Sequence, residues 1–161
     1  LPGSLYHHVA SKQDVLLCVF LHLLDERDKA WRQFPRRRGI HGELQGFVKF
    51  VLAWQLSHPA NVKVLEHEHR HLDAHSQAWL AKRSNSLRSH LLGLLRKGQQ
   101  QGVFGDIDIE SAALAIMALL GTADALRRSS ISWTASRLEA HFLQMTLRLI
   151  DVKQAAPLAR A

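Results

Sequence analysis

The hydrophobic and polar positions of this chain repeat with the period of an α-helix. Between Ser11 and Pro35, apolar residues recur at the spacing of one helical face, at Val15, Leu16, Val19, Phe20, Leu23 and Leu24. The same period predicts further helices over about Ile40 to His58, Ala60 to Leu72, Ala74 to Gln101, Ile109 to Leu126 and Thr134 to Val152. No strand alternation or internal repeat accompanies them. We therefore expect an all-α helical bundle.

Two of these helices have more apolar surface than one core can cover. The helix from Ile109 to Leu126, for which Asp108 is the predicted N-cap, is apolar on nearly every side, and the last helix has two apolar faces. A helix that is hydrophobic all round is buried all round, so we expect part of this surface to meet a second copy of the chain. The predicted dimer interface consists of Leu114, Leu119, Leu138, Phe142, Met145 and Leu149.

Composition narrows the class of protein without identifying it. The 161 residues are 47% hydrophobic, which is ordinary for a globular domain. The single cysteine, Cys18, lies in an apolar helical stretch and is predicted to be a buried free thiol. We find no signal peptide and no run of 18 apolar residues, so a cytoplasmic protein without a membrane partner is expected. The net charge of +7 suits a polyanion such as DNA, although many basic proteins bind none.

The first twelve residues combine residue type, spacing and position. Pro2 suits the first turn of a short helix, and Ser11-Lys12-Gln13-Asp14 has the spacing of a capping box that begins another. Two helix starts so close together require a sharp corner. The polar side chains near this corner that could bind an anion are Ser4, Tyr6, His7 and Lys12.

This stretch resembles the end of the DNA-binding motif of the TetR family of bacterial transcription regulators. The matching residues are Ser4-Leu5-Tyr6-His7-His8, Ser11-Lys12 and Asp14, and Val9 stands where the family usually has Phe. The resemblance implies that residues 1–12 are the end of a helix-turn-helix. About 35–45 residues that form its earlier helices would precede them. Residues 13–153 would form the ligand-binding and dimerisation core, and residues 154–161 a frayed tail.

The same resemblance implies a function. The full-length protein would be a homodimeric repressor that a hydrophobic small molecule releases from operator DNA, with DNA contacts from Ser4, Tyr6, His7 and Lys12. A weaker resemblance, at Glu68-x-Arg70-x-Leu72 and in the run from Gly98 to Phe104, is to regulators of fatty-acid or sterol breakdown that respond to acyl-CoA thioesters. Neither resemblance implies a cofactor or an enzymatic activity.

A helical bundle with several large side chains can leave a ligand cavity, which is usually apolar with a few polar anchors. The predicted walls are Phe20, Leu24, Trp54, Leu65, Leu87, Leu91 and Met117, and the predicted anchors are His69, Arg83 and Asp124. Residue by residue, a plain core position is the competing interpretation. No spacing typical of nucleophilic catalysis is present.

A second hypothesis is a helical metalloenzyme centred on residues 66–75. His67, His71 and His75 are four residues apart, and Glu66-x-x-His69 and Glu68-x-x-His71 have the spacing of a carboxylate-bridged metal site. Such a site needs the same motif on another helix, and none is found. We therefore expect a solvated polar face and no metal. A third hypothesis is that the whole chain is only a ligand-binding or dimerisation module.

Overall fold

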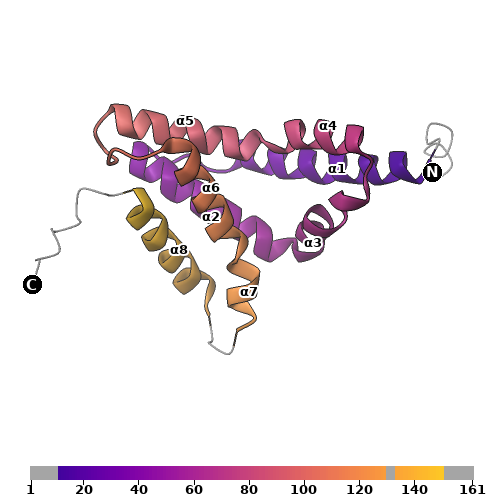
Figure 1. The fold of residues 1–161 in the computed structure, drawn as a ribbon. Helices are drawn as coiled ribbons and strands as arrows, with labels where there is room; N and C mark the ends of the chain where they lie inside the picture. The colour runs from indigo at the N-terminus through magenta and orange to yellow at the C-terminus, as the bar shows by residue number, and fades with distance from the viewer. Residues whose placement is uncertain (1–10, 130–132, 151–161) are drawn as a thin grey trace, which may run out of the picture. The chain divides into compact units, whose positions relative to one another are not determined.

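The computed structural model describes residues 11–129 and 133–150, and every regular element in these ranges is helical (Figure 1). The predicted all-α class is therefore confirmed. The chain divides into two compact units. In the described ranges the first unit comprises residues 11–34 and 58–87, and the second comprises residues 35–57, 88–129 and 133–150.

The first unit is built around one long helix. Its elements are α1 (Lys12–Gln33), α3 (Pro59–His67), the 3-10 helix η2 (His69–His71) and α4 (Ala74–Ser84). Helices α3 and α4 both pack on α1, and α4 lies along it (Figure 1). Four buried apolar side chains form the core of this unit: Phe20, Leu24, Leu72 and Leu80.

Helix α1 begins where the sequence predicts. The backbone N–H of Asp14 donates to the Ser11 hydroxyl at 3.2 Å, which confirms Ser11 as the N-cap. The inner face of the helix is turned relative to the prediction, because Phe20 and Leu24 are buried whereas Val15 and Val19 are 47% and 41% exposed.

The predicted burial of Cys18 is wrong for the same reason. Its side chain is exposed, since it lies on the outward side of the turned helix.

The second unit has a larger and almost wholly apolar interior. It contains α2 (Ile40–Ser57), α6 (Ile109–Gly121), α7 (Ala123–Arg127), α8 (Ala135–Ile150) and the part of α5 (Ser86–Gln100) from Arg88 onward. Helix α2 packs against α6, α7 and α8. Burial of one large apolar side chain contributes about 1.5–3 kcal/mol. The fully buried ones here include Leu44, Phe47, Val48, Leu91, Leu95, Ile116, Leu120, Leu138, Phe142 and Ile150.

Three predicted helices are interrupted. The helix expected over residues 74–101 breaks at Asn85, because the Ser84 hydroxyl donates back to the Ala81 carbonyl and Asn85 has ψ 0°. The helix expected over residues 109–126 breaks at Thr122, whose hydroxyl and N–H both donate to the Leu119 carbonyl. The third, over residues 60–72, ends at His67 and continues as η2.

The end of α5 shows how closely the second unit is packed. A Cβ on Gly98 would lie 2.1 Å from the ring of Phe104, so only glycine admits this buried ring. Helix α6 then begins with Asp108 as its N-cap, as predicted, and the Ser111 N–H donates to its carboxylate at 2.7 Å. Hydrogen bonds from the Ser111 side chain and backbone hold the pKa of Asp108 below its usual value.

Candidate ligand-binding pocket

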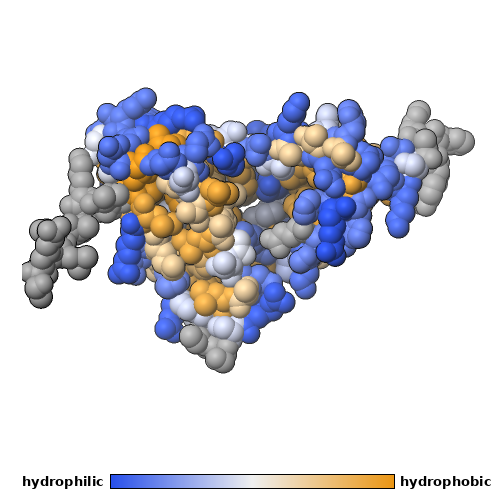
Figure 2. Space-filling view, viewed as in Figure 1, coloured by the Kyte–Doolittle hydropathy of each residue, from blue (hydrophilic) through white to orange (hydrophobic). Residues whose placement is uncertain are grey.

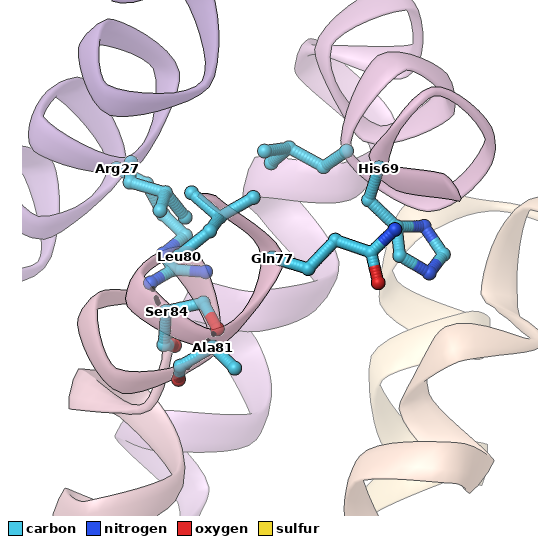
Figure 3. Close-up of a pocket in the computed structure, with 8 residues that line it drawn as sticks. Arg27, His69, Gln77, Leu80, Ala81 and Ser84 are labelled. Atoms are coloured by element: carbon cyan, nitrogen blue, oxygen red, sulfur yellow. Dashed lines mark hydrogen bonds between the residues drawn. The ribbon is translucent and has the colours of Figure 1, made fainter. Parts of the chain in front are cut away.

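A cavity of about 290 Å³ lies within the first unit (Figure 3). Helices α1, α3 and α4 and the turn η2 each contribute to its lining, which consists of Leu24, Arg27, Leu65, His69, Gln77, Leu80, Ala81 and Ser84. Leucines form its body. Figure 3 shows Arg27 beside Ser84 in one part of the cavity and the side chains of Gln77 and His69 in another. This is the usual make-up of a small-molecule site, apolar with a few polar groups.

The start of α4 sets the position of one wall. Asp73 precedes the helix, and its carboxylate accepts hydrogen bonds from the Ser76 N–H at 2.8 Å and the Ser76 hydroxyl at 3.2 Å. The backbone hydrogen bond from Ser76 is the main reason why the pKa of Asp73 lies below its usual value. The cap therefore anchors the helix that carries Gln77 and Leu80.

Arg27 and Asp28 form a buried ion pair at the cavity. Their side chains are 13% and 6% exposed, and Arg27 Nη2 lies 3.0 Å from Asp28 Oδ1. Arg27 Nη2 also donates to the Ser84 carbonyl at 3.3 Å, and the Ser86 hydroxyl donates to Asp28 Oδ1 at 2.7 Å. Buried charges are tolerated when they are paired and hydrogen-bonded. The guanidinium in the wall is thus compensated by its neighbour.

Gln13 connects the beginning of α1 to a loop at the cavity. Its Nε2 donates to the His71 carbonyl at 2.8 Å, and its Oε1 accepts from the Asp73 N–H at 3.1 Å. The carbonyl of Leu72, between them, accepts from Gln77 Nε2 at 2.8 Å. The loop of residues 71–73 is therefore held by a cavity-lining side chain and by the second residue of α1.

Only some of the predicted ligand-binding residues line this cavity. Those that do are Leu24, Leu65 and His69. Phe20 and Leu87 belong to the same unit but are buried core side chains, and Arg83 pairs with Asp25 on the surface. Their residue type was compatible with a pocket, but their packing places them elsewhere.

The other predicted ligand-binding residues are Trp54, Leu91, Met117 and Asp124. They belong to the second unit, and none of them lines the cavity. Leu91 is fully buried, and the Asp124 carboxylate pairs with Arg127 at 3.2 Å and Arg128 at 2.9 Å. Apolar or polar character within a helix does not indicate which of the two units that helix joins.

Sequence reasoning missed five lining residues: Arg27, Gln77, Leu80, Ala81 and Ser84. One signal for Arg27 was available. Asp28 lies on the same stripe of α1 as Leu24 and Trp31, and all three are buried. A carboxylate at such a position needs a cation nearby, and the adjacent residue supplies it.

Most of the predicted DNA-binding residues lie outside the described ranges, namely Ser4, Tyr6 and His7. The fourth, Lys12, is the first residue of α1, and it is exposed directly after the Ser11 cap. A lysine at a helix N-terminus is placed to reach an anion together with the backbone N–H groups. DNA contact by these four residues stays a prediction.

The histidine-rich segment does not form one helical face. His67 ends α3, His71 ends η2 and His75 lies in α4, so the three do not share a continuous helix. Among the described residues, no group of three or more potential metal ligands comes together. The geometry that the metalloenzyme hypothesis requires is therefore not found in this part of the chain.

The predicted dimer surface is partly corrected by the structure. Leu138 and Phe142 are 1% exposed and pack in the core of their own chain, so they are not available to a partner. Leu114, Met145 and Leu149 are 63%, 36% and 42% exposed. Figure 2 shows hydrophobic side chains gathered over α6 and α8. The remaining predicted residue, Leu119, is half-buried.

The segment Ile109–Arg127 is apolar enough to merit comparison with a membrane span. Its mean hydropathy is 1.6 over an 18-residue window, and 22% of that window is buried. Core helices of soluble proteins have the same length and composition. In this chain the segment is interrupted at Thr122, and α6 contributes Ile116 and Leu120 to the core of the second unit.

In the comparison with known protein families, one family model matches most of the chain. Residues 41–150 match the family model described as "Tetracyclin repressor-like, C-terminal domain". No curated protein sequence matches the chain.

Several solved structures share the fold. A tetR-family regulatory protein from Rhodococcus RHA1 has a TM-score of 0.80 at 23% identity, covering 94% of this chain and 80% of that one. The ketosteroid transcriptional regulator KstR2 of Mycobacterium tuberculosis has a TM-score of 0.73 at 23% identity, covering 94% and 79%. AibR, solved with isovaleryl coenzyme A and operator DNA, has a TM-score of 0.76 at 16% identity, covering 89% and 78%.

Proposed function

Because this chain belongs to the TetR family of transcription regulators, we propose that it is the ligand-sensing and dimer-forming part of a DNA-binding repressor. Members of the family are regulators rather than enzymes, and typically bind operator DNA, dimerise and bind small-molecule effectors. Such a protein acts on transcription in the cytoplasm. The effector binds in the cavity of the first unit. DNA is bound by a helix-turn-helix, and residues 1–12 resemble the end of that motif.

One observation carries this proposal: the cavity and the N-terminal end of α1 share a loop. Gln77 lines the cavity and binds the Leu72 carbonyl, and Gln13 binds the residues on either side of Leu72. A ligand that displaces Gln77 or His69 therefore acts on the loop of residues 71–73. Gln13, the residue after Lys12, is hydrogen-bonded to this loop. Because Ser11 and Lys12 join the first unit to the helix-turn-helix, this is where a change in the cavity reaches the DNA-binding end.

Helix α1 has the properties that the coupling needs. Its 22 residues span about 33 Å at 1.5 Å per residue, so a small tilt displaces its first turn. The ligand has to bind one arrangement of α1 better than the other, and coupling free energies are typically about 1–3 kcal/mol. The released state would hold two recognition helices out of register with operator grooves that lie about 34 Å apart.

The second unit supplies the proposed dimer. The exposed apolar side chains on α6 and α8, among them Leu114, Met145 and Leu149, would be covered by their copies around a twofold axis. A large uncovered apolar face is uncommon on a soluble monomer. With Leu138 and Phe142 assigned to the core, the interface consists of the outward faces of these two helices.

The test is a gel shift with the full-length protein and DNA from the region upstream of its own gene. We expect binding at physiological salt that is stronger than binding to scrambled DNA of the same composition. Replacing Tyr6 or Lys12 should weaken binding across sequences, with a smaller salt dependence for Lys12→Ala. Equal affinity for upstream and scrambled DNA would contradict the proposal.

A further inference from the structure

The charges around the cavity restrict which ligands it can hold. Arg27 is the one lysine or arginine among its lining residues, and its guanidinium is paired with Asp28. Two hydrogen bonds reach Asp28 Oδ1 from Arg27, at 3.0 and 3.2 Å, and a third comes from the Ser86 hydroxyl. This part of the wall is therefore polar but carries no net charge.

The other polar lining groups add no cation inside the wall. Gln77 and Ser84 are neutral, and their donor groups bind the carbonyls of Leu72 and Ala81. His69 lies on η2 and is exposed, so that water screens its interactions. A carboxylate that entered the cavity would find Arg27 already neutralised and the Asp28 carboxylate behind it. Burying a charge without a counter-charge is costly.

An uncharged polar group meets no such cost. Arg27 Nη1 donates no hydrogen bond to any residue in the described ranges, and Arg27 is one of the residues that line the cavity. A carbonyl oxygen can accept from it without adding charge. The leucines around the body of the cavity accommodate an apolar chain or ring next to that carbonyl.

The volume limits the size of the ligand. An engineered apolar cavity of about 150 Å³ holds benzene, and this cavity, at about 290 Å³, has roughly twice that volume. A medium-length acyl chain or a two-ring compound is of this size. A nucleotide-bearing carrier attached to such a chain would have to remain outside.

We propose that the cavity binds uncharged acyl amphiphiles, such as amides or esters, in preference to carboxylates of the same shape. This inference rests on the proposed function, since it assigns the chemical class of the effector. The Arg27–Asp28 pair is the selective element: Arg27 supplies the hydrogen bond, and Asp28 excludes the anion.

The experiment is calorimetric titration of the full-length protein with octanamide and octanoate, which have the same number of non-hydrogen atoms and differ in charge. We expect octanamide to bind at least about tenfold more tightly. A ratio of this size corresponds to the cost of burying one polar group without a partner. Equal or tighter binding of octanoate would overturn the inference. Failure of both compounds to bind would do so as well.

Two variants locate the effect. Asp28→Asn keeps the volume but removes the compensating charge, so we expect the preference to shift toward octanoate. Asp25→Asn is the control, because it removes the same charge from the same helix at the surface, where Asp25 pairs with Arg83. An unchanged ratio in Asp28→Asn, with a melting curve that shows a folded protein, contradicts the inference.

The wild-type comparison stands even if Asp28→Asn does not fold. Operator binding, measured on the same wild-type sample, separates the two proposals. If the protein selects its operator but prefers octanoate, only the ligand class is wrong. If it shows no operator selectivity, the proposed function fails.

Discussion

The two units of the chain differ in what fills them. The interior of the first unit combines a small apolar cluster around Phe20 and Leu24 with a buried ion pair and a cavity. The second unit is packed with apolar side chains, and Thr146 is its one buried polar residue within the described ranges. Close-packed interiors resist deformation, whereas poorly filled regions can rearrange at lower cost. The difference fits the proposed division of roles, in which the first unit senses the ligand and the second forms the dimer.

The difference in packing between the two units is tested most strongly by truncating one buried side chain in each. Phe142→Ala in the second unit should lower the free energy of unfolding by about 3–5 kcal/mol, since the side chain is 1% exposed among close neighbours. Leu24→Ala should cost about 2–3 kcal/mol, the low end for its type, because the removed atoms border an existing cavity. Urea unfolding measures both. A larger loss for Leu24→Ala would contradict the difference in packing.

The proposed dimer-forming role of the second unit is tested at its exposed apolar face. Leu114→Glu should raise the dimer dissociation constant by about a hundredfold, because a charge would be buried at the interface. The isolated fold should be unaffected, since Leu114 is 63% exposed. Val15→Glu, at a 47% exposed position of the first unit, is the control and should leave the dimer intact. Sedimentation velocity distinguishes the two, and a Leu114→Glu protein that remains dimeric would place the interface elsewhere.

Two glycines of α5 sharpen the account of packing in the second unit. Gly98→Ala should destabilise the fold by about 1–3 kcal/mol, because its Cβ would overlap the Phe104 ring. Gly93→Ala meets no atom within 4 Å and should stabilise the helix by up to about 1 kcal/mol. Thermal melts of both variants give opposite shifts if the ring is held tightly. A neutral Gly98→Ala would show that it is not.

The smallest expected change in stability is at Gln13. Gln13→Ala removes two exposed hydrogen bonds and should cost about 1 kcal/mol or less. Its effect on regulation should be larger, because ligand binding would no longer be transmitted from the 71–73 loop to the start of α1. We expect unchanged operator affinity without ligand and a weaker release of DNA with it. Release at the wild-type level, measured by fluorescence anisotropy, would exclude this connection.

Local signals in the sequence predicted much of the fold. Ser11 and Asp108 are predictable as N-caps because an N-cap needs only one side-chain oxygen and one backbone N–H three residues further along. The breaks at Asn85 and Thr122 were missed, since a single polar residue is compatible with a continuous helix. On α8, Thr146 is fully buried although it is polar, so the inward stripe passed through it instead of through Met145. A sequence pattern that follows only apolar residues groups Leu138 and Phe142 with the exposed Met145 and therefore places them on the wrong surface.

The candidate site was less predictable than the fold. Leu24, Leu65 and His69 were found from their residue types, but the cavity depends on which helices pack together. That choice is made by long-range contacts such as the bonds of Gln13, which join residues 58 and 60 positions apart. Periodicity within one helix carries no information about such partners.

The central claim, that the cavity of the first unit controls DNA binding, can be tested without knowing the natural ligand. Ala81→Phe introduces a ring from a residue that lines the cavity, and Ala78→Phe places the same ring on an exposed part of α4 that does not line it. In the full-length protein, we expect Ala81→Phe to lower operator affinity by about tenfold, within the usual range of coupling free energies, and Ala78→Phe to leave it unchanged. Wild-type operator affinity in a folded, dimeric Ala81→Phe protein would contradict the account.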